Sequence, residues 1–410
     1  MPFSRCKIKM QMEKRFIIVG FALSEPGTMG GNSKIALEIA RHLKGAGEVH
    51  FIVPSTKTRT IAEAIGAPPG LVVHEVPAFE GGDLRRPVAS ARHYTGILRR
   101  VLTELAVGPE DIVYSCSDFH IDTLPCRRLQ PVFKFRWIAV QFLFVPFIFE
   151  NLIRGYKFPA FKYLLVWLYS NVLFRLARQR AAAFVITNDS DRGHFPAAFQ
   201  KRVFPFYGGV NVDQIPTAEV PQTRDVVFCS RLHPQKGIDG FLDIWAKVKE
   251  ACPAARLTVI GNGAPAYEQM LKAKAARLGV ADSIDWLGYV NHEAKYEIYR
   301  SARVMVHPTV FDNNGMVAAE ALCSGLPVVM YDLPALREVY TTGCVKVPFG
   351  DQAAFAEAVV RLLSDLVSLQ EARPNETQLV EMRNHWDWTN RVVQFQNWLS
   401  VGGMVKDCIQ

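Results

Sequence analysis

The sequence predicts an α/β protein made of two Rossmann-like domains, each a doubly wound parallel sheet. Three observations support this prediction. The chain has 410 residues, which is too long for one ordinary hydrophobic core. Short apolar runs typical of buried strands alternate with helical stretches, a pattern that indicates a parallel sheet. The series of strands stops near residues 206–224 and then restarts, so we expect a domain junction there.

The first domain is predicted over residues 1–212. Residues 15–23 form a short apolar run that ends in small residues, and residues 24–43 contain a Gly-rich loop followed by a helical stretch. The later apolar runs of this half are 49–55, 111–117, 135–142 and 182–188. Their alternation with helical stretches predicts that they are parallel strands of one sheet.

The second domain is predicted over residues 213–384. Its apolar runs are 225–232, 255–263, 283–290, 302–309, 326–332 and 343–350. Ligands of open parallel sheets bind outside the carboxyl ends of the strands. With two such domains, a cleft that both of them face is the expected site.

Composition limits the classes of partner. The formal net charge is +8, which favours anionic partners such as phosphates or acidic lipid. Nucleic acid is not expected, because no zinc-finger spacing, RNA-recognition signature or basic helix is present. The 8 cysteines include no C-x-x-C pair, which argues against structural zinc and a disulfide framework and fits a reducing cytosol. The first sixteen residues do not resemble a secretory signal, and either Met1 or Met12 can be the start.

Two cations follow the first strand of the second domain. Arg231 ends the run 225–232, and Lys236 lies beside Gly237, where we expect a helix to begin. Two fixed positive charges and the free N–H groups of a helix N-terminus suit a diphosphate. The alternative is an ordinary strand-loop-helix connection with basic residues on its surface.

Three further strand ends carry polar or small residues. They are the loop Gly261–Asn262–Gly263, the triplet Gly288–Tyr289–Val290, and a pair of carboxylates, Asp312 and Glu320. Cations suit phosphates, an apolar pair suits a base, and carboxylates suit sugar hydroxyls, so the set describes a nucleotide-sugar site at one sheet edge. The alternative for the carboxylates is that Asp312 or Asn313 caps a helix and Glu320 is solvated or salt-bridged.

Together these motifs resemble those of retaining glycosyltransferases of the GT-B fold, from the large family four (group 1). The resemblance covers residues 206–345 and rests on Arg231-x4-Lys236-Gly237, "GNG", "GYV" and Asp312-x7-Glu320 with "CSGLPVV". Residues 29–40, "MGGNSKIALEIA", are similar to the family's Gly-Gly loop that faces the diphosphate. Residues 385–398 are similar to its closing helix, so the segment 385–410 is expected to cross back to the first domain.

The resemblance implies a role for each matching position. Arg231 and Lys236 would hold the donor diphosphate, Glu320 would bind the ribose hydroxyls, and Asp312 would face the donor sugar. The other donor-binding residues that it implies are Gly30 and Gly31 near the phosphate, Gly261 in the "GNG" loop, Tyr289 and Val290 at the base, and Asn314 and Gly315 at the sugar.

Two features depart from the family pattern. The first carboxylate is Asp312 where the family has Glu, so its reach is shorter by one methylene. The family often has a His in the first domain beside the transferred sugar; here Asp118 and His120 lie near that place, and Gln141 stands where another His is sometimes found. We include His120 among the catalytic candidates, with a purely structural histidine as the alternative.

The predicted function is transfer of a sugar from a nucleotide-diphosphate donor to an acceptor with retention of configuration. Arg231 and Lys236 would stabilise the charge that develops on the leaving diphosphate. We recognise no D-x-D metal motif at a strand end, so we expect the reaction to be independent of metal and cofactor. The alternative keeps the fold and lacks activity, as a nucleotide-sugar-binding or scaffold protein. A nicotinamide oxidoreductase is not expected, because G-x-G-x-x-G does not follow residues 15–23.

Aromatic and basic residues interleave over residues 133–180, where Glu150 is the only acid. The longest uncharged run, 137–149, is too short to span a bilayer. One interpretation is a surface that rests on anionic membrane, with Arg154, Lys157 and Lys162 on headgroups. The other is a core strand followed by an amphipathic core helix. We expect a cytoplasmic protein. Under the first interpretation it attaches peripherally to the cytoplasmic face of the membrane. We expect its acceptor to be lipid-linked or a glycan precursor.

Overall fold

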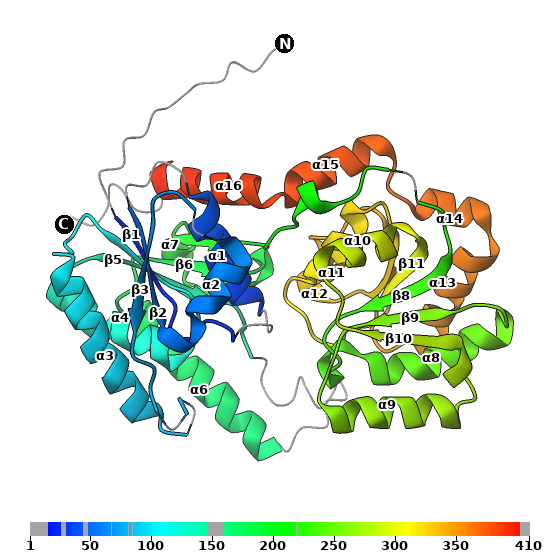
Figure 1. Cartoon of the computed structure of the whole chain (residues 1–410), viewed down its shortest axis with the longest axis horizontal. Helices are drawn as coiled ribbons and strands as arrows, with labels where there is room; N and C mark the ends of the chain where they lie inside the picture. Colours follow the sequence, from blue (N-terminus) through cyan, green and yellow to red (C-terminus); the bar gives the residue numbers. More distant parts are fainter. Residues whose placement is uncertain are drawn as a thin grey trace, which may run out of the picture. The chain divides into compact units, whose positions relative to one another are not determined.

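The computed structural model describes residues 15–25, 30–43, 48–66, 68–80, 82–83, 85–145, 160–218 and 220–401. The chain forms two compact units. The first contains residues up to Tyr207 together with those from Arg391 onward, and the second runs from Gly208 to Asn390. The sequence predicts these boundaries after residues 212 and 384, and the structure has them after residues 207 and 390. Figure 1 shows a parallel sheet with helices on both of its faces in each unit.

The first unit contains a seven-stranded parallel sheet with the order β3-β2-β1-β4-β5-β6-β7. Its strands are β1 (Phe16–Val19), β2 (Val49–Pro54), β3 (Leu71–Val76), β4 (Ile112–Ser115), β5 (Arg136–Gln141), β6 (Ala183–Ile186) and β7 (Val203–Pro205). The five strands that the sequence predicts in this half are all present. β3 and β7 lie outside the predicted runs. The strand order reverses between β1 and β4, which is where open sheets of this kind bind ligands.

The helices of the first unit follow the strands as a doubly wound fold requires. Among the described residues they are α1 (Gly31–His42), α2 (Thr58–Ile65), α3 (Pro87–Glu104), α4 (His120–Phe133), α6 (Ala160–Arg178), α7 (Ala197–Gln200) and, from Arg391, most of α16 (Trp388–Val401). α4 packs against both α3 and α6 on one face of the sheet.

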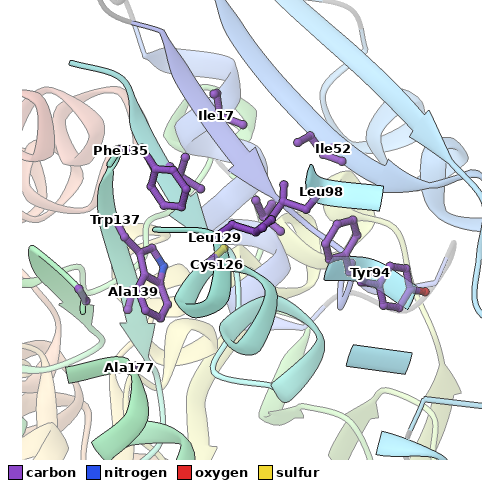
Figure 2. Packing of buried hydrophobic residues seen from close by; sticks show 14 of the residues in the cluster. Ile17, Ile52, Tyr94, Leu98, Cys126, Leu129, Phe135, Trp137, Ala139 and Ala177 are labelled. Carbon is purple, nitrogen blue, oxygen red and sulfur yellow. The ribbon is translucent and has the colours of Figure 1, made fainter. Parts of the chain in front are cut away.

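Side chains of alternate parity face the two sides of this sheet. On one side Ile17 and Ile52 pack with Tyr94 and Leu98 of α3 and Leu129 of α4, in the core that Figure 2 shows. On the other side the ring of Phe16 lies 6.3 Å from the ring of Phe395, and Phe204 lies 5.4 Å from the same ring. The C-terminal helix therefore completes the core of the first unit on its second face.

The second unit contains a six-stranded parallel sheet with the order β10-β9-β8-β11-β12-β13. Its strands are β8 (Arg224–Cys229), β9 (Leu257–Ile260), β10 (Ile284–Gly288), β11 (Ala302–His307), β12 (Val328–Tyr331) and β13 (Cys344–Val347). These are the six strands that the sequence predicts. The order reverses between β8 and β11, so the loops after these two strands lie side by side at the carboxyl edge.

The helices of the second unit are α8 (Ile238–Ala251), α9 (Pro265–Arg277), α10 (His292–Arg300), α11 (Met316–Cys323), α12 (Pro334–Arg337), α13 (Gln352–Ser364), α14 (Leu366–Ala372) and α15 (Glu376–Trp386). α8 packs against α9 and α13, and α11 packs against α10 and α15 (Figure 1). Within the described ranges, none of the chain's helices has the length and hydrophobicity that a membrane-crossing segment needs.

Candidate functional site

The loop after β8 carries the two predicted cations. Arg231 is exposed, and Lys236 ends a short 3-10 turn, η4 (Pro234–Lys236), directly before α8. Gly237 caps α8 with φ of +72°, and a Cβ there would lie 1.9 Å from the carbonyl oxygen of Pro308. Only glycine fits this approach, because any other residue would meet a backbone atom. The helix begins at Ile238, as the sequence predicts.

The loop after β11 is hydrogen-bonded to the loop after β8. The N–H of Val310 donates to the carbonyl of Gln235 at 3.0 Å, and the side-chain amide of Gln235 donates to the carbonyl of Phe311 at 2.9 Å. These bonds hold the two loops together, and they bring Lys236 to the predicted carboxylate Asp312.

Lys236 and Asp312 form an ion pair with 2.5 Å between Nζ and Oδ2. The other carboxylate oxygen of Asp312 accepts the N–H groups of Asn314 and Gly315 at 3.2 and 3.1 Å. Burial alone would raise the pKa of Asp312, but the charge of Lys236 and these hydrogen bonds hold it well below its usual value. Asp312 is therefore ionised at neutral pH.

The two interpretations of Asp312 both describe part of what is observed. Asp312 organises the turn before α11, as a capping residue does, and Gly315 at the N-cap of α11 has φ of +59°. The amides of Asn314 and Gly315, predicted to lie near sugar hydroxyls, donate to Asp312 in this structure. The same carboxylate also contacts the predicted phosphate-binding lysine, which an isolated cap would not do.

Glu320 forms an ion pair with a residue that the sequence analysis does not single out. Its Oε1 lies 2.7 Å from Nζ of Lys295 on α10. Its Oε2 is shielded from solvent and has no hydrogen-bond partner among the described residues, as is also true of Oδ1 of Asn314. Buried acceptors without donors cost free energy, so a ligand hydroxyl group that reaches either atom would be stabilised by it.

His307 and Tyr340 complete this part of the second unit. Nε2 of His307 lies 3.7 Å from Oδ2 of Asp312, and burial lowers the pKa of His307 to about 4, so its ring is neutral near pH 7. The hydroxyl of Tyr340 donates to the carbonyls of Asn314 and Gly315 at 2.7 and 2.8 Å and fixes the turn. The sequence analysis does not predict His307 as a site residue. Its position at a strand end is the one signal that could have pointed to it.

The loop after β9 contains the predicted Gly261. Its φ is +128°, and a Cβ there would lie 1.9 Å from the carbonyl oxygen of Ser230. The N–H of Gly261 donates to the carbonyl of Gly288 at 2.7 Å, so β8, β9 and β10 end in one connected group of loops. An open pocket of about 490 Å³ lies here, lined by Arg231, Leu232, His233, Pro234, Asn262, Gly263, Ala264 and Tyr267.

Tyr289 and Val290 follow the end of β10. The side chain of Tyr289 is 71% exposed, and that of Val290 is half-buried. An exposed tyrosine at this sheet edge is accessible to a base, and the pair remains a prediction for that role.

The predicted residues of the first unit lie at the carboxyl edge of its own sheet. Gly30 is the N-cap of α1, which has no side-chain cap and no acidic residue in its first turn, and Gly31 is the first residue of the helix. The N–H of Gly30 donates to the hydroxyl of Ser24 at 3.0 Å. A helix N-terminus of this kind suits an anion, and the contact with a phosphate remains a prediction.

His120 is buried at the start of α4, and both of its ring nitrogens have protein partners. Nε2 lies 3.0 Å from the hydroxyl of Ser90, and Nδ1 lies 2.6 Å from the hydroxyl of Tyr169. This network favours the structural role over the catalytic one. Gln141 donates to Asp118 at 3.4 Å, and burial raises the pKa of Asp118 to about 6.

The expectation about D-x-D motifs needs a correction. Asp189–Ser190–Asp191 follows β6, so the sequence does contain such a triplet near a strand end. Asp189 pairs with Arg192 at 2.7 Å, and Asp191 accepts the side-chain amide of Asn188 at 2.8 Å. Among the described residues, no group of three or more His, Cys, Asp or Glu side chains could hold a metal ion. Independence of metal remains a prediction.

The aromatic and basic segment is described only in part. Residues 146–159 and the side chains of residues 160–163 lie outside the description, so Arg154, Lys157 and Lys162 are not placed. Further along α6, Leu173, Phe174 and Ala177 are buried, as the core interpretation expects, and the membrane interpretation remains a prediction. The apolar side chains of α6 that are exposed are Leu164, Leu165, Val166, Leu168 and Val172.

Comparison with known proteins relates the second unit to one family. A family model described as "Glycosyl transferases group 1" matches residues 223–365. A phosphatidyl-myo-inositol mannosyltransferase of Mycobacterium leprae is 37% identical over 166 residues, which cover 38% of this chain and 42% of that protein. A D-inositol 3-phosphate glycosyltransferase of Segniliparus rotundus is 35% identical over 111 residues, covering 27% and 25%. The chain thus spans less than half the length of these curated relatives.

Solved structures match along nearly the whole chain. Alr3699/HepE of Anabaena, in complex with UDP and glucose, has a TM-score of 0.69 at 15% identity, covering 94% of this chain and 99% of that one. Sucrose-phosphate synthase of Thermosynechococcus elongatus has a TM-score of 0.76 at 16% identity, covering 94% and 98%. The chain therefore has the GT-B fold. Its second unit carries a region that matches the group 1 glycosyl transferases, as the resemblance implied, and the predicted fold is confirmed.

Proposed function

We propose that this protein transfers a sugar from a nucleotide-diphosphate donor to an acceptor, with retention of configuration at the transferred carbon. The observation that carries the proposal is a set of three charged residues: Lys236 and Asp312, which form an ion pair after β8 and β11, and Glu320 on α11, the helix that follows Asp312. It combines a fixed cation, an ionised carboxylate and a shielded carboxylate oxygen that lacks a donor among the described residues. A diphosphate and the hydroxyls of two sugars supply the complementary groups.

The chemistry requires stabilisation of a leaving group. As the bond from the sugar carbon to the diphosphate oxygen breaks, negative charge grows on the diphosphate, and Arg231, Lys236 and the N-terminus of α8 stabilise it. The acceptor oxygen bonds to the same carbon from the same face, and its proton passes to a diphosphate oxygen. The ammonium of Lys236 has three N–H donors, so it can bind the diphosphate while it keeps Asp312 in place.

Asp312 and Glu320 have separate roles in this proposal. Asp312 is ionised and accepts a hydrogen bond from a hydroxyl of the transferred sugar. Glu320, held by Lys295, accepts from the ribose hydroxyls through its second oxygen. The first contact bears on the reacting sugar, and the second on the part of the donor that does not react.

The names of the relatives suggest which ligands to test first. The names of two relatives include an inositol compound, one of these names also includes a mannosyl group, and the structure of Alr3699/HepE contains UDP. For this chain we propose a hexose linked to a nucleoside diphosphate as the donor, and an acceptor that is lipid-linked or carries an inositol or glycan group.

A catalytically weak or inactive nucleotide-sugar-binding protein is the second candidate. Two observations favour it: Asp312 replaces the longer Glu of the family, and His120 is engaged by Ser90 and Tyr169. The two candidates differ in turnover and agree in donor binding.

A thermal-shift screen of nucleotide-sugars tests donor binding. A donor at about 100 times its Kd should stabilise the protein by about 2.7 kcal/mol. Release of nucleoside diphosphate from the donor that binds, with and without acceptor, then separates transferase from binding protein. Stabilisation without release supports the second candidate, and absence of stabilisation by every nucleotide-sugar contradicts both.

We also propose that the first unit rests on an anionic membrane surface. The exposed apolar side chains of α6 are accompanied by Arg175, Arg178 and Arg180, and the net charge of the chain is +8. Apolar side chains insert at the lipid interface while each basic residue near anionic lipid contributes about 1 kcal/mol. Anionic lipid is the occupant that both properties fit.

Vesicle sedimentation tests the membrane proposal. We expect the protein to sediment with anionic vesicles at low salt, less at high salt, and not with neutral vesicles. Changing Arg154, Lys157 and Lys162 to Glu should abolish sedimentation. Val166→Asp on α6 should weaken it, while Val380→Asp, at a similarly exposed valine of α15, should not. Failure of the native protein to sediment with anionic vesicles at low salt would contradict the proposal and favour a soluble acceptor.

A further inference from the structure

A second pocket of the second unit lies at the amino edge of its sheet, away from Lys236 and Asp312. It has a volume of about 280 Å³. Its lining residues are Val220, Gln222, Tyr299, Arg300, Ala302, Ser324, Gly325, Arg373, Leu379 and Arg383. Three of these carry guanidinium groups and none of them is acidic. We call it the arginine pocket.

Each arginine is anchored by a backbone carbonyl. Arg383 donates through Nε to the carbonyl of Cys323 at 2.9 Å, at the end of α11. Arg373 donates through Nη2 to the carbonyl of Ala302 at 3.3 Å, at the start of β11, and Arg300 donates through Nη1 to the carbonyl of Pro216. Because these bonds use only some of the five donors of each guanidinium, the groups are oriented and still have N–H groups to offer.

Some of the remaining donors are without partners. Nε of Arg300 and Nε of Arg373 are shielded from solvent and have no hydrogen-bond partner within the described part of the chain. The exposed side chain of Gln222, with its amide oxygen turned toward Arg373, accepts from Nη1 of that residue at 2.7 Å. The side chain that accepts a hydrogen bond from Arg373 in the pocket is thus the neutral amide of Gln222.

The charges around the pocket repel one another. Burial lowers the pKa of Arg373, and the nearby charge of Arg303 lowers it further. Burial also lowers the pKa of Arg383, with a further contribution from Arg300. Arg303 lies 3.8 Å from Asp225, a long and partly exposed ion pair. Such repulsion makes an anion in the pocket favourable.

We propose that the arginine pocket binds a phosphate group, either as free phosphate or as the phosphate of a small monoester. The planar, forked donors of arginine match the oxygens of phosphate, and several forks can bind one dianion. The volume accommodates a phosphate and a few further atoms. This site is separate from the donor site, and the proposal does not rest on glycosyl transfer.

The decisive variant is Gln222→Glu, which changes one nitrogen to an oxygen at an exposed position. The new carboxylate pairs with Arg373 and occupies the place of the anion, so the fold should keep its stability. Arg373→Gln removes a cation directly. Arg277→Gln, at an exposed arginine of α9 remote from the pocket lining, is the matched control for loss of charge.

Phosphate binding is measured by calorimetry and thermal shift at constant ionic strength, with chloride as the reference anion. Because the donor site also attracts phosphate, the titrations are repeated in a Lys236→Ala background. We expect phosphate to bind the native protein and the Lys236→Ala variant alike. Gln222→Glu and Arg373→Gln should weaken binding by about tenfold or more, and Arg277→Gln by less than about twofold.

Glycerol phosphate and glycerol distinguish the two sources of phosphate. Tighter binding of the monoester than of inorganic phosphate identifies a phosphorylated metabolite, and the reverse identifies free phosphate, with glycerol itself not binding in either case. Stabilisation by phosphate no greater than by chloride would overturn the proposal. Equal phosphate affinity in the native protein and in Gln222→Glu would also overturn it. If only Lys236→Ala lost binding, the phosphate would be assigned to the donor site.

Discussion

Lys236 and Asp312 lie 76 residues apart in the sequence and 2.5 Å apart in space. Their side chains are 19% and 13% exposed, so the pair is largely shielded from solvent. The sequence assigns the lysine to the diphosphate and the carboxylate to the sugar. The structure joins the two into one charged unit, so a change at either residue alters the electrostatics at both.

Asp312→Asn should lower turnover more than it lowers donor affinity. The amide can still accept the loop N–H groups, but it no longer balances Lys236 or binds the sugar as an anion. We expect kcat to fall by about 10²-fold with KM changed much less, because the contact is to the reacting sugar. Steady-state kinetics measure this. Asp332→Asn, which breaks the more exposed pair with Arg337, is the control and should leave kcat unchanged.

Glu320→Gln should have the opposite pattern. A carboxylate that binds ribose hydroxyls contributes to ground and transition states alike, so its loss appears mainly in KM and in nucleotide affinity. Lys295→Met should do the same, because it removes the cation that orients Glu320. Lys274→Met breaks ion pairs to Asp239 and Asp243 elsewhere and is the matched control. If Glu320→Gln and Lys295→Met lost kcat equally and only through unfolding, Glu320 would have a structural role.

The sequence predicts the strands well, because a strand buried on both faces is an apolar run that can be recognised locally. β3 is missed because its residues Leu71–Val76 are half-buried or exposed, except Val76, and include His74 and Glu75. β7 is missed because it has only three residues. The pairing of Lys295 with Glu320 could not be predicted, since it joins two helices through packing. The arginine pocket likewise brings together residues from 220 to 383, and no local motif marks it.

Gly261→Ala should destabilise the second unit strongly. The new Cβ would meet the carbonyl oxygen of Ser230 at 1.9 Å, and φ of +128° is closed to alanine. Gly279→Ala is the matched control, because Gly279 has φ of +69° with nothing within 4 Å of the added carbon. We expect Gly261→Ala to cost at least about 2 kcal/mol more than Gly279→Ala in denaturant unfolding. Equal losses would show that the loop after β9 adapts freely.

Asp122 should give the stability of the first unit a dependence on pH. It is fully buried, and it accepts the N–H of Phe21 at 2.8 Å and the hydroxyl of Ser117. Burial raises its pKa from 3.8 to about 7, so between these values the folded state keeps a proton that the unfolded state has lost. The contribution of Asp122 to the free energy of unfolding is therefore fully present at low pH. It falls by about 1.4 kcal/mol per pH unit as pH rises through this window.

The side chain in Asp122→Asn does not titrate. The free energy of unfolding of this variant, minus that of the native protein, should therefore increase steadily between pH 5 and pH 7. Urea unfolding at several pH values measures the difference, with the exposed Asp282→Asn as the control. A constant difference between Asp122→Asn and the native protein over this range would mean that Asp122 is ionised in the folded state.

The central claim is that Arg231 and Lys236 stabilise a leaving diphosphate. Its most direct test is the rate of nucleoside diphosphate release from the bound donor in Arg231→Ala, because Arg231 is exposed and its removal leaves no charge buried. We expect kcat to fall by about 10² to 10³-fold in Arg231→Ala and in Lys236→Ala, with the fold retained, and to change less than about twofold in Arg277→Ala. Near-native release by Arg231→Ala and Lys236→Ala would contradict the account.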